Sequence, residues 1–183
     1  RTGAHGEAVA VLTDAMRLHP RDEELLYTLG TVLERSGATA EAIARMRELL
    51  EVNPRNAAAM NFIGYTLADR TTRYAEALQL IDRARVAEPD NPAIIDSYGW
   101  VLYRQGKYQQ AAELLAQSAA QAPDNGEIQF HLGMANYMMG RSEDARAALE
   151  KAVASPGDFG AKDEAKSWLA LLSQAGNLSI PDL

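Results

Sequence analysis

The 183-residue chain contains no cysteine, which excludes disulfide bonds, thiolate metal sites and a thiol nucleophile. Continuous apolar runs long enough for a membrane-spanning helix, about 18 residues, are absent as well. Basic residues are scarce: 18 Lys and Arg stand against 25 Asp and Glu, for a net charge of −7, which argues against nucleic-acid binding. The three histidines, His5, His19 and His131, do not have the spacing of metal ligands, so we expect no metal.

What the chain does contain is self-similarity with a period of about 34 residues. Successive intervals of 34, 35 and 34 residues separate the glycines Gly30, Gly64, Gly99 and Gly133. The same period recurs in the alanines Ala8, Ala42, Ala77, Ala111 and Ala145 and in the prolines Pro20, Pro54, Pro89 and Pro123. The one longer interval places an extra residue between Gly64 and Ala77, and we expect it in a turn spanning residues 69–73.

Each copy of the period predicts two short helices that pack antiparallel. In residues 91–122, apolar residues recur at helical spacing before and after Gly106, which marks a tight turn between the helices. Asp22, Asn56, Asn91 and Asn125 each lie two residues after a proline and are expected N-caps. A glycine inside a helix costs about 1 kcal/mol relative to alanine. The repeated glycine therefore indicates that the second helix, with its repeated alanine, approaches closely.

In these positions the chain resembles tetratricopeptide repeat (TPR) proteins over nearly its whole length. The matching residues are Leu29-Gly30, Ala42 and Pro54, then Ile63-Gly64, Ala77 and Pro89, then Tyr98-Gly99, Ala111 and Pro123. The resemblance implies an all-α fold, a right-handed superhelical solenoid of antiparallel helix pairs, without enzymatic activity or cofactor. We assign 1–21 to the second helix of a truncated repeat, 22–55, 56–90, 91–124 and 125–157 to repeats, 158–176 to a C-terminal capping helix and 177–183 to a tail.

The two ends of the chain carry further expectations. The first helix is predicted over residues 7–18, with Gly3 and Gly6 in the turn before it. No signal peptide is visible, and because the chain begins at Arg1 within a repeat, we expect a fragment or a processed product. The apolar tail, residues 178–183, either lies on its own array or docks into a neighbouring molecule.

In a superhelix of helix pairs the first helices line the concave side, where we expect a binding site for protein or peptide. The predicted site residues are Tyr27, Thr31, Asn61, Tyr65, Asp96, Trp100, Tyr103, Arg104, Phe130, Met134 and Tyr137. Six of them are aromatic, half of all the aromatic residues of the chain, and aromatic residues are enriched at interfaces. The alternative is that some of these rings fill gaps between helices. None of the residues is lysine, unlike in the TPR proteins that grip a C-terminal carboxylate with lysine and asparagine.

No catalytic constellation or phosphate-binding glycine loop is found. Asp96 and Ser97 lie one repeat before His131 and could come near it, as a nucleophile and base would. We interpret these three as ordinary polar residues of the binding face.

The predicted function is a non-enzymatic scaffold that binds a partner polypeptide segment, with a self-assembling homo-oligomer as the alternative. Residues 61–70 and 96–103 resemble bacterial envelope TPR proteins, many of which are lipid-anchored adaptors for other proteins. The resemblance favours the bacterial periplasm, associated with the outer membrane, over the cytoplasm. It implies membrane contact only through a lipid anchor upstream of Arg1.

Overall fold

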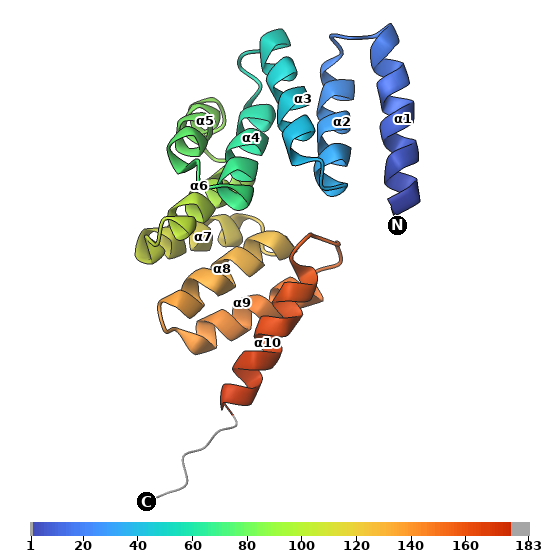
Figure 1. The fold of residues 1–183 in the computed structure, drawn as a ribbon. Helices are drawn as coiled ribbons and strands as arrows, with labels where there is room; N and C mark the ends of the chain where they lie inside the picture. The colour runs from blue at the N-terminus through green and yellow to red at the C-terminus, as the bar shows by residue number, and fades with distance from the viewer. Residues whose placement is uncertain (1, 177–183) are drawn as a thin grey trace, which may run out of the picture. The chain divides into compact units, whose positions relative to one another are not determined.

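The computed structural model describes residues 2–176, and within this range the chain forms ten α-helices and no strand (Figure 1). The helices are α1 (Thr2–Leu18), α2 (Glu23–Arg35), α3 (Thr39–Val52), α4 (Ala57–Arg70), α5 (Tyr74–Ala87), α6 (Pro92–Arg104), α7 (Tyr108–Gln121), α8 (Gly126–Met138), α9 (Ser142–Ala154) and α10 (Lys162–Gly176). None of these helices combines the length and the apolar character that crossing a membrane requires. The predicted all-α array of helix pairs is confirmed, whereas its superhelical course stays a prediction.

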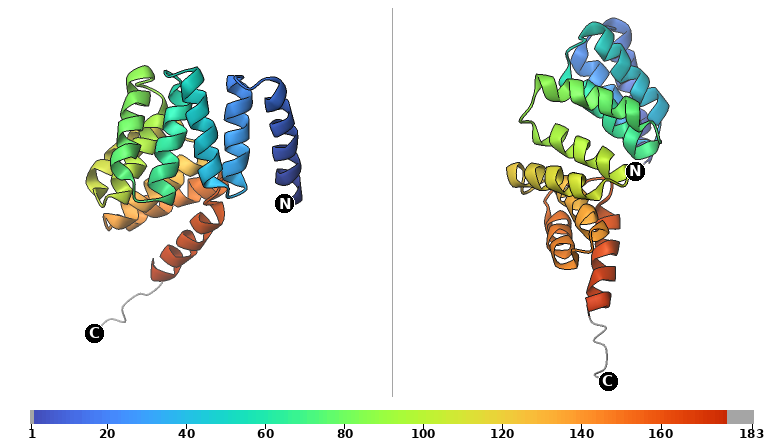
Figure 2. Two further views of the ribbon diagram at one scale, coloured as in Figure 1. Left: turned by 45° about the horizontal axis from the view of Figure 1, so that its top comes forward. Right: turned by 90° about the vertical axis from the view of Figure 1, so that its left-hand side faces the viewer.

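The chain divides into two compact units, residues 1–89 and residues 90–183. In the first unit α2 pairs with α3 and α4 pairs with α5, and α1 packs against α2 (Figure 2). Its core includes Leu29, Leu33 and Ala42, against which Leu12 and Met16 of α1 pack. The α1 helix therefore takes the place that the second helix of a repeat would occupy.

In the second unit α6 pairs with α7, α8 pairs with α9, and α10 packs mainly against α9 with further contacts to α8 (Figure 1). One core cluster contains Leu102 of α6, Leu115 of α7 and Ala135 of α8, so three consecutive helices meet there. On α10, Ala165 and Leu172 are buried.

The four predicted N-caps are confirmed in the structure. Each cap side chain accepts a hydrogen bond from a backbone N–H of the first turn, an arrangement that stabilises helix starts. The distances to the caps are 2.9 Å from Leu25 N to Asp22, 2.9 Å from Ala59 N to Asn56, 2.9 Å from Ala93 N to Asn91 and 3.1 Å from Glu127 N to Asn125. The repeat boundaries are thus encoded locally by single polar residues.

The close approach predicted at the mid-helix glycines is also confirmed. A Cβ on Gly64 would lie 2.6 Å from Ile81 Cγ1 and 2.9 Å from the carbonyl oxygen of Ala77. A Cβ on Gly99 would lie 2.8 Å from Leu115 Cγ. Each glycine therefore meets the large apolar residue one helical turn after the repeated alanine, together with the backbone of that alanine.

The extra residue between Gly64 and Ala77 lies in α4, and its predicted placement in the turn is wrong. The α4 helix has 14 residues whereas α2, α6 and α8 have 13, and the turn after each of them has three residues. In the other three turns a glycine adopts a positive φ, for example 78° at Gly106. Thr71 replaces this glycine and is extended, with φ −141°, so the helix runs one residue further before the chain turns.

The first helix begins at Thr2 rather than at residue 7, so the prediction of a turn at Gly3 and Gly6 is wrong. Gly6 is exposed, and a Cβ there would have no neighbour within 4 Å. A glycine lowers helix stability by about 1 kcal/mol without ending the helix. These glycines therefore did not mark a boundary.

Alanine substitutions at Gly64 and Gly6 should have effects of opposite sign. Gly64→Ala is expected to lower the free energy of unfolding by about 2 kcal/mol, because the new methyl group meets Ile81 and a backbone oxygen that cannot move away. Gly6→Ala should leave stability unchanged or raise it by up to about 1 kcal/mol. Urea denaturation of both variants measures the difference, and equal effects would contradict the packing described here.

Candidate functional site

The eleven predicted site residues all lie on α2, α4, α6 and α8, the first helices of the four pairs, but they differ in exposure. Seven side chains are half-buried: Tyr27, Thr31, Asn61, Tyr65, Tyr103, Arg104 and Tyr137. The other four are buried, with exposed fractions of 5% for Asp96, 7% for Trp100, 3% for Phe130 and 5% for Met134. For these four residues the prediction of an open, ring-lined surface is wrong.

In the first unit, side-chain contacts join α2 and α4, and one of them involves the predicted residue Tyr27. The ring of Tyr27 meets the ring of Phe62 edge to face, with centroids 6.4 Å apart. Near the C-terminal ends of the same two helices, Arg70 Nη2 donates to Glu34 Oε1 at 3.1 Å. Asn61 lies beside Phe62 in sequence, and its buried Oδ1 has no hydrogen-bond donor within the described residues.

In the second unit, the predicted rings Trp100 and Phe130 are buried in a cluster of aromatic side chains. Trp100 of α6 lies parallel to the imidazole of His131 on α8, with ring centroids 4.0 Å apart and an interplanar angle of 20°. Tyr103, one turn later on α6, also stacks on Trp100, with ring centroids 4.6 Å apart and an interplanar angle of 6°. Phe130 contacts Trp100 and Phe159, each with a centroid distance of 6.3 Å. These rings fill the space between helices, which is the alternative that the sequence left open.

A buried polar pair joins the same two helices. Nδ1 of His131 lies 2.9 Å from Oδ2 and 3.0 Å from Oδ1 of Asp96, and His131 is only 1% exposed. Ser97, also buried, donates to the backbone oxygen of Ala93 at 2.9 Å. The three residues are close, as expected, but they are part of the core, so their interpretation as a polar binding face is wrong. Within the described residues no group of acidic or histidine side chains has the arrangement of a metal site.

The segment after α9 covers part of the second unit. Trp168 of α10 packs against Tyr137, with ring centroids 4.9 Å apart. Burial raises the pKa of Tyr103, and the neighbouring Tyr108 and the negative charge of Glu164 on α10 raise it further. The sequence had assigned α10 to the end of the array. Phe159, which precedes α10, and Trp168 on α10 were the signal that the segment after α9 also packs on the predicted site.

Removing the Asp96 carboxylate should destabilise the second unit. We expect Asp96→Ala to lower the free energy of unfolding by about 2 kcal/mol or more, because the buried Nδ1 of His131 loses its carboxylate partner. Ser97→Ala, the matched control on the same helix, breaks only a bond within one turn and should cost less than about 1 kcal/mol. Thermal denaturation followed by circular dichroism compares the two, and an equal loss would contradict a structural role for the pair.

Comparison with known proteins identifies relatives in sequence and in structure. A protein family described as "Tetratricopeptide repeat" matches residues 27–92 and 99–159, which are more than half of the chain. TPR repeat-containing protein PA4667 of Pseudomonas aeruginosa is 43% identical over 100 residues, which are 55% of this chain and 17% of that protein. The chain therefore matches less than a fifth of that relative's length.

Solved structures extend the likeness in fold. TTC0263 of Thermus thermophilus, a thermophilic TPR protein, has a TM-score of 0.77 and 21% identity, covering 94% of this chain and 92% of its own. PilW, described as a type IV pilus biogenesis factor, has a TM-score of 0.72 and 21% identity, covering 93% and 82%. These identities show a shared fold only. With the repeat pattern, the helix pairs and the family match in agreement, the chain belongs to the tetratricopeptide repeat family.

Proposed function

We propose that the chain is a non-enzymatic scaffold that binds a segment of a partner polypeptide at the α2/α4 face, defined as Tyr27, Thr31, Asn61 and Tyr65. The family consists of repeat proteins that typically mediate contacts between proteins, and this supports the general role. The α2/α4 face is favoured because none of its four side chains is buried in the core.

The chemistry of the α2/α4 face suits a polypeptide. Tyr27 and Tyr65 are half-buried, so each combines a fixed ring with accessible surface, a combination enriched at interfaces. Asn61 carries an amide nitrogen that can donate to a carbonyl oxygen of a peptide backbone, whereas its Oδ1 is buried. The single observation that carries the proposal is the partial exposure of all four side chains of the α2/α4 face, on two helices that are tied by the Tyr27–Phe62 contact and the Glu34–Arg70 ion pair.

The remaining predicted residues divide into two roles. We propose that Tyr103, Arg104 and Tyr137, which are half-buried in the second unit, contribute further contacts to a partner. The buried residues, such as Trp100 and Phe130, would act only indirectly, by holding α6 and α8 together. A loss of binding on mutating Trp100 would therefore reflect unfolding, since truncating a buried tryptophan to alanine typically costs about 3–5 kcal/mol.

The setting of this scaffold is proposed to be a multiprotein complex of the bacterial envelope, with the cytoplasm as the alternative. The relative in Pseudomonas aeruginosa supports a bacterial setting. PilW is described as a pilus biogenesis factor, so the same fold serves a surface assembly in that protein. A lipid anchor upstream of Arg1 is part of this proposal.

Substitutions in the α2/α4 face should weaken binding without unfolding the chain. We expect the double variant Asn61→Ala, Tyr65→Ala to bind a partner about 30-fold more weakly, the equivalent of about 2 kcal/mol. Tyr74→Ala, which alters a half-buried tyrosine of α5 outside this face, serves as the control. Proteins captured from the source cells by the wild type would be purified and titrated calorimetrically against the wild type, Tyr74→Ala and the double variant. Unchanged affinity of the double variant, with circular dichroism like wild type, would rule out this face.

Self-assembly is the second proposed function, and the exposed side of α1 favours it. Val11 is 68% exposed and Leu18 is 78% exposed, so this helix offers an apolar strip to a second molecule. The predicted involvement of the tail, residues 178–183, falls outside the described residues.

Sedimentation velocity tests self-assembly. The wild type is measured at about 100 µM, which exceeds the micromolar Kd of a weak specific contact. If α1 mediates self-assembly, the protein should then sediment as a dimer or a larger species. The double variant Val11→Lys, Leu18→Lys should then sediment as a monomer, because two buried charges would oppose the contact. A wild type that stays monomeric removes this second function and leaves the scaffold unaffected.

A further inference from the structure

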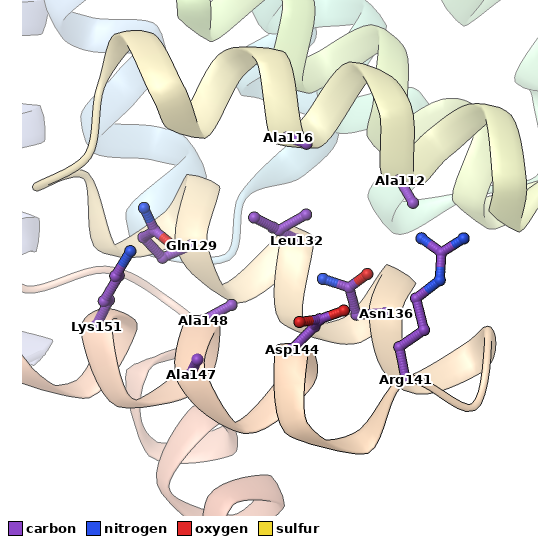
Figure 3. Close-up of a pocket in the computed structure, with 10 residues that line it drawn as sticks. All are labelled: Ala112, Ala116, Gln129, Leu132, Asn136, Arg141, Asp144, Ala147, Ala148 and Lys151. Atoms are coloured by element: carbon purple, nitrogen blue, oxygen red, sulfur yellow. The ribbon is translucent and has the colours of Figure 1, made fainter.

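A second candidate binding site lies in the second unit, in a groove between α7 and α9 whose floor is α8 (Figure 3). The groove has a volume of about 330 Å³, and Gln129, Leu132 and Asn136 form its floor. Its walls are largely alanines of α7 and α9. This groove lies on a different face of α8 from Phe130 and Met134, and it is independent of the α2/α4 face.

The floor of the groove is polar where the other repeats are apolar. Asn136 lies three residues after Gly133, and the residues at this position in the other three repeats are the buried leucines Leu33, Leu67 and Leu102. Gln129 lies four residues before Gly133, where the other repeats have Leu26, Met60 and Ile95, also buried. The fourth repeat therefore carries two amides at positions that serve as hydrophobic core elsewhere.

The two amides differ in their hydrogen bonds. Gln129 Nε2 donates to the carbonyl oxygen of Pro123 at 3.0 Å, so the amide of Gln129 has a hydrogen-bond partner close in sequence. Asn136 is only 7% exposed, and its side chain has no hydrogen-bond partner within residues 2–176. Figure 3 shows its carboxamide in the groove between α7 and α9. Its amide atoms are not sealed from solvent, so a ligand in the groove can reach them and complete their hydrogen bonds.

The groove is open because a large side chain is missing from its wall. Ala148 lies three residues after Ala145, and the corresponding residues in the two preceding repeats are Leu80 and Leu114. Leu114 packs against the core cluster of Leu102 and Leu115, whereas Ala148 leaves that space empty in the fourth repeat. The hollow beside Ala148 therefore has room for an aliphatic side chain.

The rim of the groove carries charge of both signs. Asp144 and Lys151 are exposed on α9, and neither takes part in an ion pair within the described part of the chain. Arg141 Nη2 donates to Gln109 Oε1 of α7 at 3.3 Å, which ties one end of the groove together. Lys151 lies toward the other end, beside Gln129 (Figure 3). An acidic residue of a ligand would find its counter-charge there.

We propose that this groove binds an extended segment of a partner polypeptide, with one aliphatic side chain in the hollow beside Ala148. The backbone of that segment pairs with the carboxamide of Asn136, because an asparagine amide presents one donor side and one acceptor side, as a peptide group does. An acidic residue nearby in the segment pairs with Lys151. The segment thus supplies the three features that the fourth repeat lacks: a leucine-sized side chain, hydrogen-bond partners and a counter-charge.

The experiment fills the groove with a larger side chain of the protein itself and measures thermal stability and peptide binding on the same variants. Ala148→Leu restores the side chain of the preceding repeats, and Asn136→Leu restores the leucine of the other three. Both variants are expected to have a higher Tm than the wild type, because each adds a leucine side chain that packs in the groove. Ala154→Leu makes the same change at an exposed position of α9 and is the matched control.

Binding is followed by NMR with the blocked peptide acetyl-Glu-Ala-Leu-Ala-Glu-amide, and with the same peptide carrying glycine for leucine. In the wild type and in Ala154→Leu, the leucine peptide should shift the side-chain amide resonances of Asn136, and the glycine peptide should bind at least tenfold more weakly. Ala148→Leu should weaken binding of the leucine peptide at least tenfold. The proposal is overturned if the Asn136 resonances do not move at millimolar peptide, if Ala148→Leu binds like the wild type, or if Asn136→Leu lowers the Tm.

Discussion

The contact between a mid-helix glycine and a large apolar side chain of the paired helix is the constraint on which the rest of this structure depends. At Gly30, Gly64, Gly99 and Gly133 the partner is Met46, Ile81, Leu115 and Leu149 in turn, always too near for a Cβ. Because the first helix can approach only at this point, its rotation relative to the second helix is fixed. That rotation decides which residues enter the core and which remain accessible.

The helix pairs, their caps and their glycine contacts could be predicted because all three depend on residues within one repeat. Asn91, for example, caps the helix that starts at the next residue. The exposure of the predicted site could not be predicted in the same way. Trp100 is covered by His131 of the following repeat, and Tyr137 by Trp168 of α10, 31 residues later. A helical pattern identifies the face of a helix but not the distant side chains that cover it.

Departures from the repeat were more informative about function than the repeat itself. Thr71 replaces a turn glycine, and the helix before it gains a residue. Asn136 replaces a core leucine, Ala148 replaces the half-buried leucine of the two preceding repeats, and a groove opens between α7 and α9. Comparing equivalent positions along the sequence would have found both cases. The first unit presents tyrosines and an amide at accessible positions, whereas the second unit buries its equivalent rings and exposes a different face.

The packing register is tested most directly by the rate at which each methionine is oxidised by hydrogen peroxide in the folded protein, measured by mass spectrometry of peptides. The six methionines sample both the glycine contact and the predicted site. Met46 is 0% exposed against Gly30 and Met134 is 5% exposed, whereas Met138, one turn further along α8, is 42% exposed. The register predicts fast oxidation of Met138, with Met46 and Met134 protected until the protein unfolds. Oxidation of Met46 and Met134 as fast as that of Met138 would contradict it.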